Sequence, residues 1–372
     1  MKWTALPAAA AAILAACAPR HDPPPDSPRA QAPTAATSAA YAYTIEEVGP
    51  GVFAFVQPIQ RGGLVSGNAL AVVGDDGVVV VDTGHFPSLA RKMIADIRRL
   101  TDKPVRYVVT THWHPDHLFG NGAFKDAYPG VTFVAHTETR RLALAHDPEY
   151  VDKQRNVDKL LVRYRQILAS GKRPNGVALT KDEQAVVSLT VAELEQTLGD
   201  ADVTLVPPAM TFDDAVTLHL GRREVRVMHL GRGNTAGDAV VYVPDAKVLA
   251  TGDVVVAPTP YAYGSYFAEW IAVLQKIEAL DVRVLLPGHG PLQRDLQYVK
   301  TLEGLFTSLR AQTKDAVAAG LSLDETRKKI DLESFRRAMA ADPGDRVVFD
   351  VSFVTPGVER AYQEAKGKLE DE

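Results

Sequence analysis

The segment that most restricts what this chain can fold into is "VVTTHWHPDHLFGN", residues 108–121. An apolar, strand-like run ends there, and three histidines and one aspartate follow within six positions: His112, His114, Asp116 and His117. Imidazole and carboxylate groups at this density suit a borderline-soft cation such as Zn²⁺. His112 and His114, two positions apart, can hold one metal, and Asp116 and His117 can face a second. A histidine-rich polar loop that binds no metal is the alternative.

Strand-like and helix-like segments alternate along the chain in two successive batches. β-Branched runs predict strands at 52–57, 69–73, 77–81, 105–110 and 131–134, and again at 216–220, 224–229, 239–243, 248–250 and 282–286. Apolar residues at helical spacing predict helices over 88–100 and 267–280. We therefore predict an α/β (α+β) fold with two sheets packed together and helices outside.

Two further regions have mainly helical patterns. One is a long insertion at about 137–198, and the other is a C-terminal extension over 296–372 with a β-like patch at 346–353. The folded domain between the N-terminal region and this extension is predicted to cover 41–295.

The loop at 112–117 resembles the metallo-β-lactamase superfamily, whose motif H-x-H-x-D-H it meets in full. The resemblance extends over about Tyr43 to Leu292. It includes Asp82 in "VVVVDTG", for which it implies hydrogen bonds that order the metal loop. The fold that the resemblance implies is the αββα sandwich of that superfamily.

Two later segments match the same family in the expected order. Asp253 in "VLATGDVVV" and His289 in "VLLPGHGPL" occupy its carboxylate and last histidine positions. The resemblance therefore implies a complete second metal site of Asp116, His117, His289 and Asp253.

The first metal site departs from the family pattern. Its third histidine is expected in a turn of the type G-H-T-x-G, but here the turn is "GNTAG" and Asn234 occupies that position. Asn234 could be a weak ligand or hydrogen-bond a metal-bound water, because a neutral amide binds zinc less well than imidazole. His229, five positions earlier, is an alternative ligand. A phosphate-binding loop is excluded, because the turn leads into a strand and not a helix.

The reaction implied by the resemblance is hydrolysis with zinc as the cofactor, with one firm site and a second, weak site; iron or manganese stays open. Hydroxide on the metal would attack a carbonyl-type bond of a small molecule (ester, thioester, lactone or lactam), and Asp116 would hold the nucleophile and carry its proton. Arg232, Tyr261 and Tyr263 are candidate substrate contacts. The alternatives are a salt bridge from Arg232 to Asp238 or another acid, and packing of the tyrosines.

Three other functions stay open at this point. The first is a β-lactamase that hydrolyses β-lactam antibiotics, although Val256 stands where such enzymes often carry a lysine. The second is an iron-dependent persulfide dioxygenase, and the third is a non-catalytic metal-binding lipoprotein.

The N-terminal 40 residues have a different character from the rest of the 372-residue chain. Residues 1–16 resemble a signal peptide, and "LAAC" resembles a bacterial lipobox with Cys17 as the lipidated residue. Residues 17–40 are rich in Pro and Ala and predict a tether. We therefore expect a lipoprotein on a membrane of the bacterial cell envelope, facing the periplasm, with the outer membrane favoured. A plain signal peptide with an incidental cysteine is the alternative. Because Cys17 is the only cysteine and the net charge is −5, neither an intrachain disulfide nor a nucleic-acid partner is expected.

Overall fold

The computed structural model describes residues 43–59 and 66–371. The predicted signal peptide, Cys17 and the tether lie outside these residues. Within the described ranges, no helix is both long enough and apolar enough to cross a membrane.

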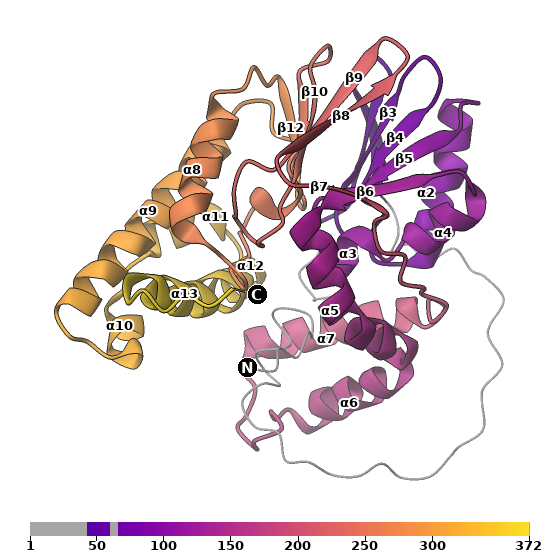
Figure 1. Ribbon diagram of the computed structural model, residues 1–372. Coiled ribbons are helices and arrows are strands. Elements are labelled where there is room, and N and C mark those ends of the chain that lie inside the picture. Colours follow the sequence, from indigo (N-terminus) through magenta and orange to yellow (C-terminus); the bar gives the residue numbers. More distant parts are fainter. Residues whose placement is uncertain (1–42, 60–65, 372) are drawn as a thin grey trace.

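Two β-sheets form the centre of the molecule (Figure 1). The seven-stranded sheet has the order β1-β2-β3-β4-β5-β6-β7; its strands are β1 (Thr44–Gly49), β2 (Val52–Val56), β3 (Ala69–Val73), β4 (Val78–Val81), β5 (Val105–Val109), β6 (Thr132–His136) and β7 (Met210–Phe212). The five-stranded sheet has the order β12-β11-β10-β9-β8; its strands are β8 (Ala215–Leu220), β9 (Arg223–Met228), β10 (Val240–Val243), β11 (Val248–Ala250) and β12 (Val284–Leu286). Strands β4 to β7 are parallel, as are β11 and β12, and the other pairs are antiparallel.

The main apolar core lies between the sheets, and strand β4 shows why the sequence produces it. Side chains alternate across a strand, so Val79 and Val81 join the core between the sheets while Val78 and Val80 join the core under the outer helices. All four valines are buried. A strand with both faces covered therefore reads as a continuous apolar run.

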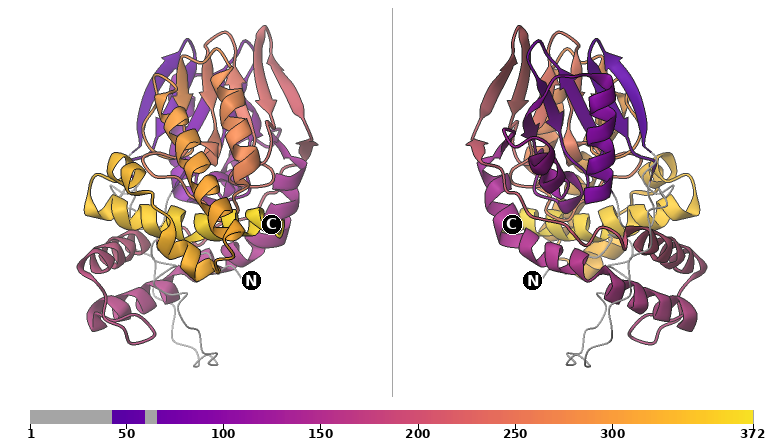
Figure 2. Two further views of the ribbon diagram at one scale, coloured as in Figure 1. Left: turned by 90° about the vertical axis from the view of Figure 1, so that its left-hand side faces the viewer. Right: turned by 90° about the vertical axis from the view of Figure 1, so that its right-hand side faces the viewer.

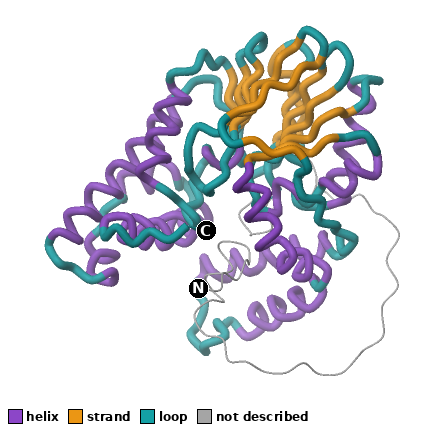
Figure 3. The backbone as a smooth tube through the Cα atoms, viewed as in Figure 1, coloured by secondary structure: helices purple, strands orange, loops and turns teal. Residues whose placement is uncertain are grey.

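Helices cover the outer faces of both sheets (Figures 2 and 3). On the first sheet lie α2 (Pro87–Leu100) and α4 (Asn121–Ala127), and on the second α8 (Phe267–Glu278) and α9 (Gln297–Ala318). In α2, Leu89, Met93 and Ile97 recur every four residues and are buried, as expected for one apolar face of a helix. The αββα arrangement expected from the sequence is confirmed.

The insertion after β6 is helical. It consists of α5 (Thr137–Arg155), α6 (Val157–Ser170) and α7 (Lys181–Thr197). In Figure 1, α6 and α7 lie below the two sheets as a pair. Buried residues of both helices, including Leu161 and Val187, extend the core under the first sheet.

The C-terminal extension is helical as well. After α9 come α10 (Leu323–Lys329), α11 (Glu333–Met339), α12 (Pro343–Val348), the π-helical turn η3 (Phe349–Val354) and α13 (Thr355–Ala365). The prediction of β structure at 346–353 is wrong. Phe349 and Phe353, four residues apart, are both fully buried, and Phe353 stacks on Phe306 of α9 at 5.8 Å between ring centroids. Helical spacing against α9 therefore outweighs the β-branched composition of this segment.

Candidate metal centre

The predicted ligands converge because each follows the C-terminal end of a strand. His112 and its neighbours follow β5, with Pro115 opening the short helix α3 (Pro115–Leu118) that carries Asp116 and His117. Asp253 lies in the 3₁₀ turn η2 (Gly252–Val254) after β11, and His289 follows β12. Since β11 and β12 are parallel neighbours, their C-terminal ends meet at one edge of the sheet.

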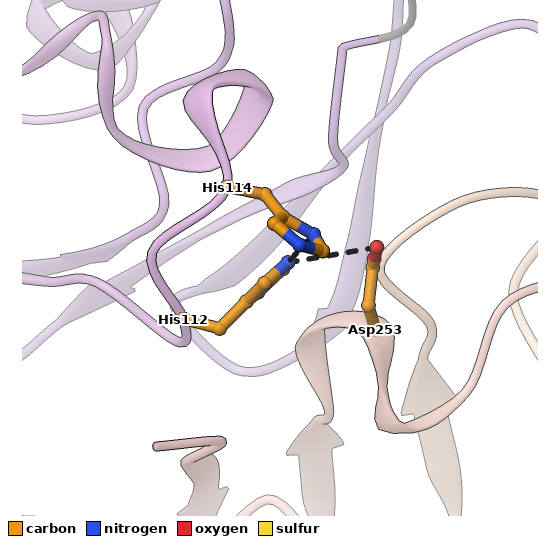
Figure 4. A group of neighbouring side chains, drawn as sticks. All are labelled: His112, His114 and Asp253. Carbon is orange, nitrogen blue, oxygen red and sulfur yellow. Dashed lines mark hydrogen bonds and ion pairs between the residues drawn. The ribbon is translucent and has the colours of Figure 1, made fainter. Parts of the chain in front are cut away.

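Two groups of side chains could each hold one metal ion. The first group is His112, His114 and Asp253 (Figure 4), and the second is Asp116, His117 and His289; in each, the candidate ligand atoms lie within 4.8 Å of one another. In the first group, His112 Nε2 lies 3.0 Å from His114 Nδ1 and 3.5 Å from Asp253 Oδ2. Three nitrogen and oxygen donors at this spacing can provide three of the four ligands of a tetrahedrally coordinated cation.

The second group is held by a buried carboxylate that is not one of its members. Asp82, at the end of β4, lies 2.7 Å from His117 Nδ1 and accepts hydrogen bonds from the backbone N–H and the hydroxyl of Thr111. His117 Nε2 therefore points at the group, 3.3 Å from His289 Nε2. Asp82 adopts a left-handed backbone (φ 58°) without being glycine, a strained conformation of the kind found at functional sites. This is the ordering contact that the sequence resemblance implies for Asp82.

Asp253 faces both groups. Its Oδ2 is directed to His112, as above, and its Oδ1 lies 3.2 Å from His117 Nε2 and 3.4 Å from His289 Nε2. The sequence resemblance places Asp253 in the second site. In the structure its carboxylate also completes a set of three donors with His112 and His114.

The histidines around the ligand carboxylates favour the ionised form of these groups. Burial alone would raise the pKa of Asp116, but His117 and His289 next to it hold that pKa well below the usual range. Burial likewise acts against ionisation of Asp253, and the pKa is nevertheless lowered by His289, His117 and His112. Conversely, burial opposes a charge on His117, but Asp116, Asp253 and Asp82 raise its pKa well above the ordinary value. Since a metal ligand must be deprotonated, metal binding by the second group is coupled to proton release.

The turns around the ligands leave no room for extra side chains. A Cβ on Gly288 would lie 2.1 Å from Asp253 Oδ1, and one on Gly67 would lie 2.4 Å from the His117 ring. Glycine at these two positions thus permits the close approach of the His289 turn and of the segment before β3 to the ligands.

Asn234 lies fully buried in the turn between β9 and β10. Thr235 donates to Asp238 through both its backbone N–H and its hydroxyl, and the N–H of Ala239 donates to the carbonyl of Thr111, beside the metal loop. Among the described residues, neither atom of the Asn234 amide has a hydrogen-bond partner. Since a buried polar group without a partner is costly, this amide fits a site completed by a metal ion or its water.

His229 joins neither ligand group. Its ring stacks on His136 at 4.1 Å between centroids, and its Nδ1 lies 2.7 Å from the carbonyl oxygen of Asp238. His229 therefore contacts the Asn234 turn through the Asp238 carbonyl and does not face the ligand groups.

The candidate substrate contacts lie in three different settings. Arg232 pairs with Glu269 and Asp371 and lies over the Tyr266 ring, so its guanidinium ties α8 to the C-terminal end; a role as a carboxylate clamp has no support in these contacts. The Tyr263 hydroxyl is buried beside Ser352, and burial raises its pKa. Tyr261 alone faces a ligand, with its ring 5.6 Å from that of His289.

Three functional contacts were not found from the sequence. They involve Thr111, which links Asp82 to His112, Asn68, which holds the His289 turn, and Gln57, which lines a pocket beside His289. Threonine, asparagine and glutamine are common at strand ends, so no local signal distinguishes these three.

Comparison with known proteins places this arrangement in a family. The family described as "Metallo-beta-lactamase superfamily" matches residues 62–289. A linear primary-alkylsulfatase from Pseudomonas sp. is 28% identical over 275 residues, which cover 69% of this chain and 48% of the alkylsulfatase. This chain thus spans about half the length of that relative.

Two solved structures show the same fold. A metallo-beta-lactamase from Pontibacter korlensis has a TM-score of 0.52 and 21% identity, covering 72% of this chain and 99% of that one. A stereoselective inverting sec-alkylsulfatase from Pseudomonas sp. has a TM-score of 0.61 and 17% identity, covering 87% of this chain and 50% of that one. A match over 87% of this chain must include part of the helical insertion and part of the C-terminal extension. The likeness to the alkylsulfatase fold therefore extends beyond the two sheets.

Proposed function

Because the chain belongs to the metallo-beta-lactamase superfamily, whose members are metal-dependent hydrolases, we propose that it hydrolyses alkyl sulfate monoesters at the two ligand groups. The observation that carries the proposal of a hydrolase is the shared carboxylate of Asp253 between two sets of metal donors. The sulfate ester is taken from the 28% identical alkylsulfatase.

We propose zinc as the metal, since the superfamily uses a dinuclear site that is usually zinc. His112, His114 and Asp253 would hold one ion, with Asn234 as a weak or water-mediated ligand, and the second group would hold the other together with Asp253. The donors fit such ions: they are imidazole and carboxylate groups, and the unpartnered Asn234 amide lies in the adjacent turn. When bound, such ions supply Lewis acidity, which polarises an ester oxygen and lowers the pKa of a coordinated water.

Besides the metal ions, Asp116 is the proposed catalytic group. Its carboxylate stays ionised, so it can accept a hydrogen bond from the attacking water and orient it. The proton that water loses passes through Asp116 to the oxygen of the departing alcohol, which leaves hydrogen sulfate and a neutral alcohol. Asp82 does not touch the substrate in this scheme; it keeps the His117 ring in place.

A lactam substrate is less well supported by the residues around the site. Val256, in the position where lactamases often carry a lysine, is only 2% exposed and pairs with His289 through the backbone. Because valine is uncharged, this position cannot provide the cation that would bind the carboxylate of a lactam. The carbonyl-type bond expected from the sequence, whether ester, thioester, lactone or lactam, is kept as the second candidate, since a metallo-beta-lactamase shares the fold.

A substrate panel separates these functions. The full chain, loaded with zinc, is assayed with n-octyl sulfate, a carboxylic ester, a thioester, a lactone, a carbapenem and a chromogenic cephalosporin. We expect release of inorganic sulfate from n-octyl sulfate, and turnover of a carbonyl substrate alone would overturn the sulfatase proposal. Iron- or manganese-loaded protein tests the metal, and oxygen consumption with a persulfide tests the dioxygenase. Metal binding without any turnover would identify a non-catalytic metal-binding lipoprotein.

We also propose that Cys17 anchors the chain to a bacterial membrane, on the lipobox-like "LAAC" and the following Pro/Ala-rich stretch. Metabolic labelling with a tagged fatty acid tests this: the wild type should carry the label and Cys17→Ser should not. Label on both proteins, or on neither, contradicts lipidation at this residue.

A further inference from the structure

A pocket opens directly beside the second ligand group. Its wall comes from four parts of the chain: the turn with His289, the residues after β2, the loop after η2, and α12 in the C-terminal extension. Apolar side chains of Pro58, Ile59, Ala257, Pro258 and Val348 form one part of the lining, and polar residues form the rest. A substrate bound at the second group would place one of its substituents here.

Gln57 is one of the polar residues that line the pocket beside these apolar side chains. Its side chain is only 4% exposed, and neither the oxygen nor the nitrogen of its amide has a hydrogen-bond partner within the described part of the chain. Buried amides in native proteins are nearly always bonded, so such an exception requires an explanation. An amide that lines a pocket next to a candidate metal ligand is accounted for by a partner that enters from outside.

Gln57 is fixed relative to His289 by a single side chain. The Asn68 carboxamide oxygen accepts the backbone N–H of Gln57 at 2.8 Å, and its nitrogen donates to the carbonyls of Pro287 and Gly290, both at 2.9 Å. The N–H of Ala257 also donates to the carbonyl of His289. These bonds fix the backbone of Gln57 relative to the His289 turn.

Helix α12 of the C-terminal extension lines one side of the pocket, and α7 of the insertion packs against this helix. Val348 of α12 packs on Val186 of α7, and Tyr261 packs against the same pair while its ring faces His289. Asp345 of α12 also lines the pocket and is 7% exposed. An acidic group in the wall disfavours an anionic substituent.

We propose that Gln57 determines substrate specificity by donating a hydrogen bond to a neutral oxygen, such as an ether, in the alkyl chain of the departing alcohol. This inference rests on the proposed function. A plain alkyl chain would fill the apolar part of the pocket but leave the Gln57 amide without a partner. An ether oxygen in that chain accepts a hydrogen bond from the Gln57 amide nitrogen, while the carbon atoms of the chain fill the apolar part.

The test compares two sulfate esters of equal length, 2-butoxyethyl sulfate and n-heptyl sulfate, on the zinc-loaded full chain. Wild type should have the higher kcat/KM for the ether, and Gln57→Met should lower the ratio of the two kcat/KM values about tenfold. Gln154→Met is the matched control, because Gln154 is also buried (6% exposed) with an unpartnered amide nitrogen but does not line the pocket. An equal ratio in wild type and Gln57→Met overturns the inference while leaving the sulfatase proposal intact.

A binding measurement keeps the inference testable when sulfate is not released. Saturation-transfer NMR on the full chain compares 2-butoxyethanol with 1-heptanol, which need no turnover. Wild type should bind the ether alcohol more tightly, and Gln57→Met should reverse the order. Equal binding of the two alcohols by wild type is expected if Gln57 hydrogen-bonds only to water, and this result overturns the inference. Absence of sulfate release in the enzyme assay overturns only the proposed function.

Discussion

The two ligand groups lie side by side but are supported very differently. In the second group, His117 is held by Asp82 at 2.7 Å and His289 lies 3.0 Å from Asp116. In the first group, His112 Nδ1 lies 3.1 Å from the Thr111 hydroxyl and not beside a carboxylate. The third histidine position of the family is occupied by Asn234, whose amide has no partner among the described residues.

The electrostatics differ in the same direction. Carboxylates raise the pKa of His117, whereas burial and the neighbouring His112 lower the pKa of His114 to about 3. The second group is thus surrounded by negative charge and attracts a cation before any metal binds. The first group depends on the shared Asp253 for its only carboxylate. We therefore expect the second group to hold its metal more tightly.

Replacing Asp253 should have the largest effect, because it removes a carboxylate from both groups at once. For Asp253→Asn we expect kcat to fall about 10³-fold, equivalent to several kcal/mol of lost transition-state stabilisation, together with loss of metal from both groups. Sulfate release and elemental analysis measure the two effects. Asp281→Asn, at a carboxylate that only pairs with Lys247 on the surface, serves as the control. Retention of a tenth of the activity by Asp253→Asn would contradict a shared role.

Replacing Asp82 should distinguish the groups. Removal of a carboxylate that orients a metal-binding histidine typically costs 10- to 100-fold in metal affinity, so Asp82→Asn should weaken the second group by about this factor. Zinc titration against a competing chelator provides the measurement. Asp200→Asn is a matched control, since Asp200 is also a buried carboxylate that accepts two hydrogen bonds, from Ser88. Equal losses in both variants would assign Asp82 to general stability.

Restoring the missing histidine should make the groups more alike. Imidazole is a stronger zinc ligand than a neutral amide. At limiting free zinc, wild type should hold close to one tightly bound metal per chain and Asn234→His nearer two, as determined by elemental analysis. Two tightly bound metals in wild type would show that the first group is not weakened by Asn234.

The smallest effect is expected in the turn that carries Asn234. Thr235→Val removes two buried hydrogen bonds, one donated to Asp238 and a longer one accepted from the N–H of Gly237, and should lower the free energy of unfolding by about 1–2 kcal/mol. Denaturant unfolding measures this loss, and Thr301→Val, at an exposed hydroxyl, gives the background. Zinc titration should show weaker binding at the first group only. A matching loss at the second group would mean that the turn supports the whole centre.

Sequence reasoning was most reliable where ligands lie close together in the chain. The four ligands at 112–117 are brought together by one loop, and Asp82, Asp253 and His289 were located by their strand-end motifs. The distances between segments far apart in the chain could not be predicted. The contact of Asp253 with His112 and the link from Gln57 through Asn68 to the His289 turn both depend on how separate strand ends meet. The β-like patch at 346–353 failed for a related reason, because burial of Phe349 and Phe353 against α9 decides its conformation.

The C-terminal helices have a consequence for how this protein can be divided. Trp270 of α8 is 1% exposed, and its ring lies 4.5 Å from that of Phe306 in α9. A chain shortened to the segment that matches the family would present this aromatic surface to solvent, where large apolar patches promote aggregation. For expression, or for exchanging parts between relatives, the smallest unit that keeps its interior covered therefore extends past the family segment and includes the helices that follow it.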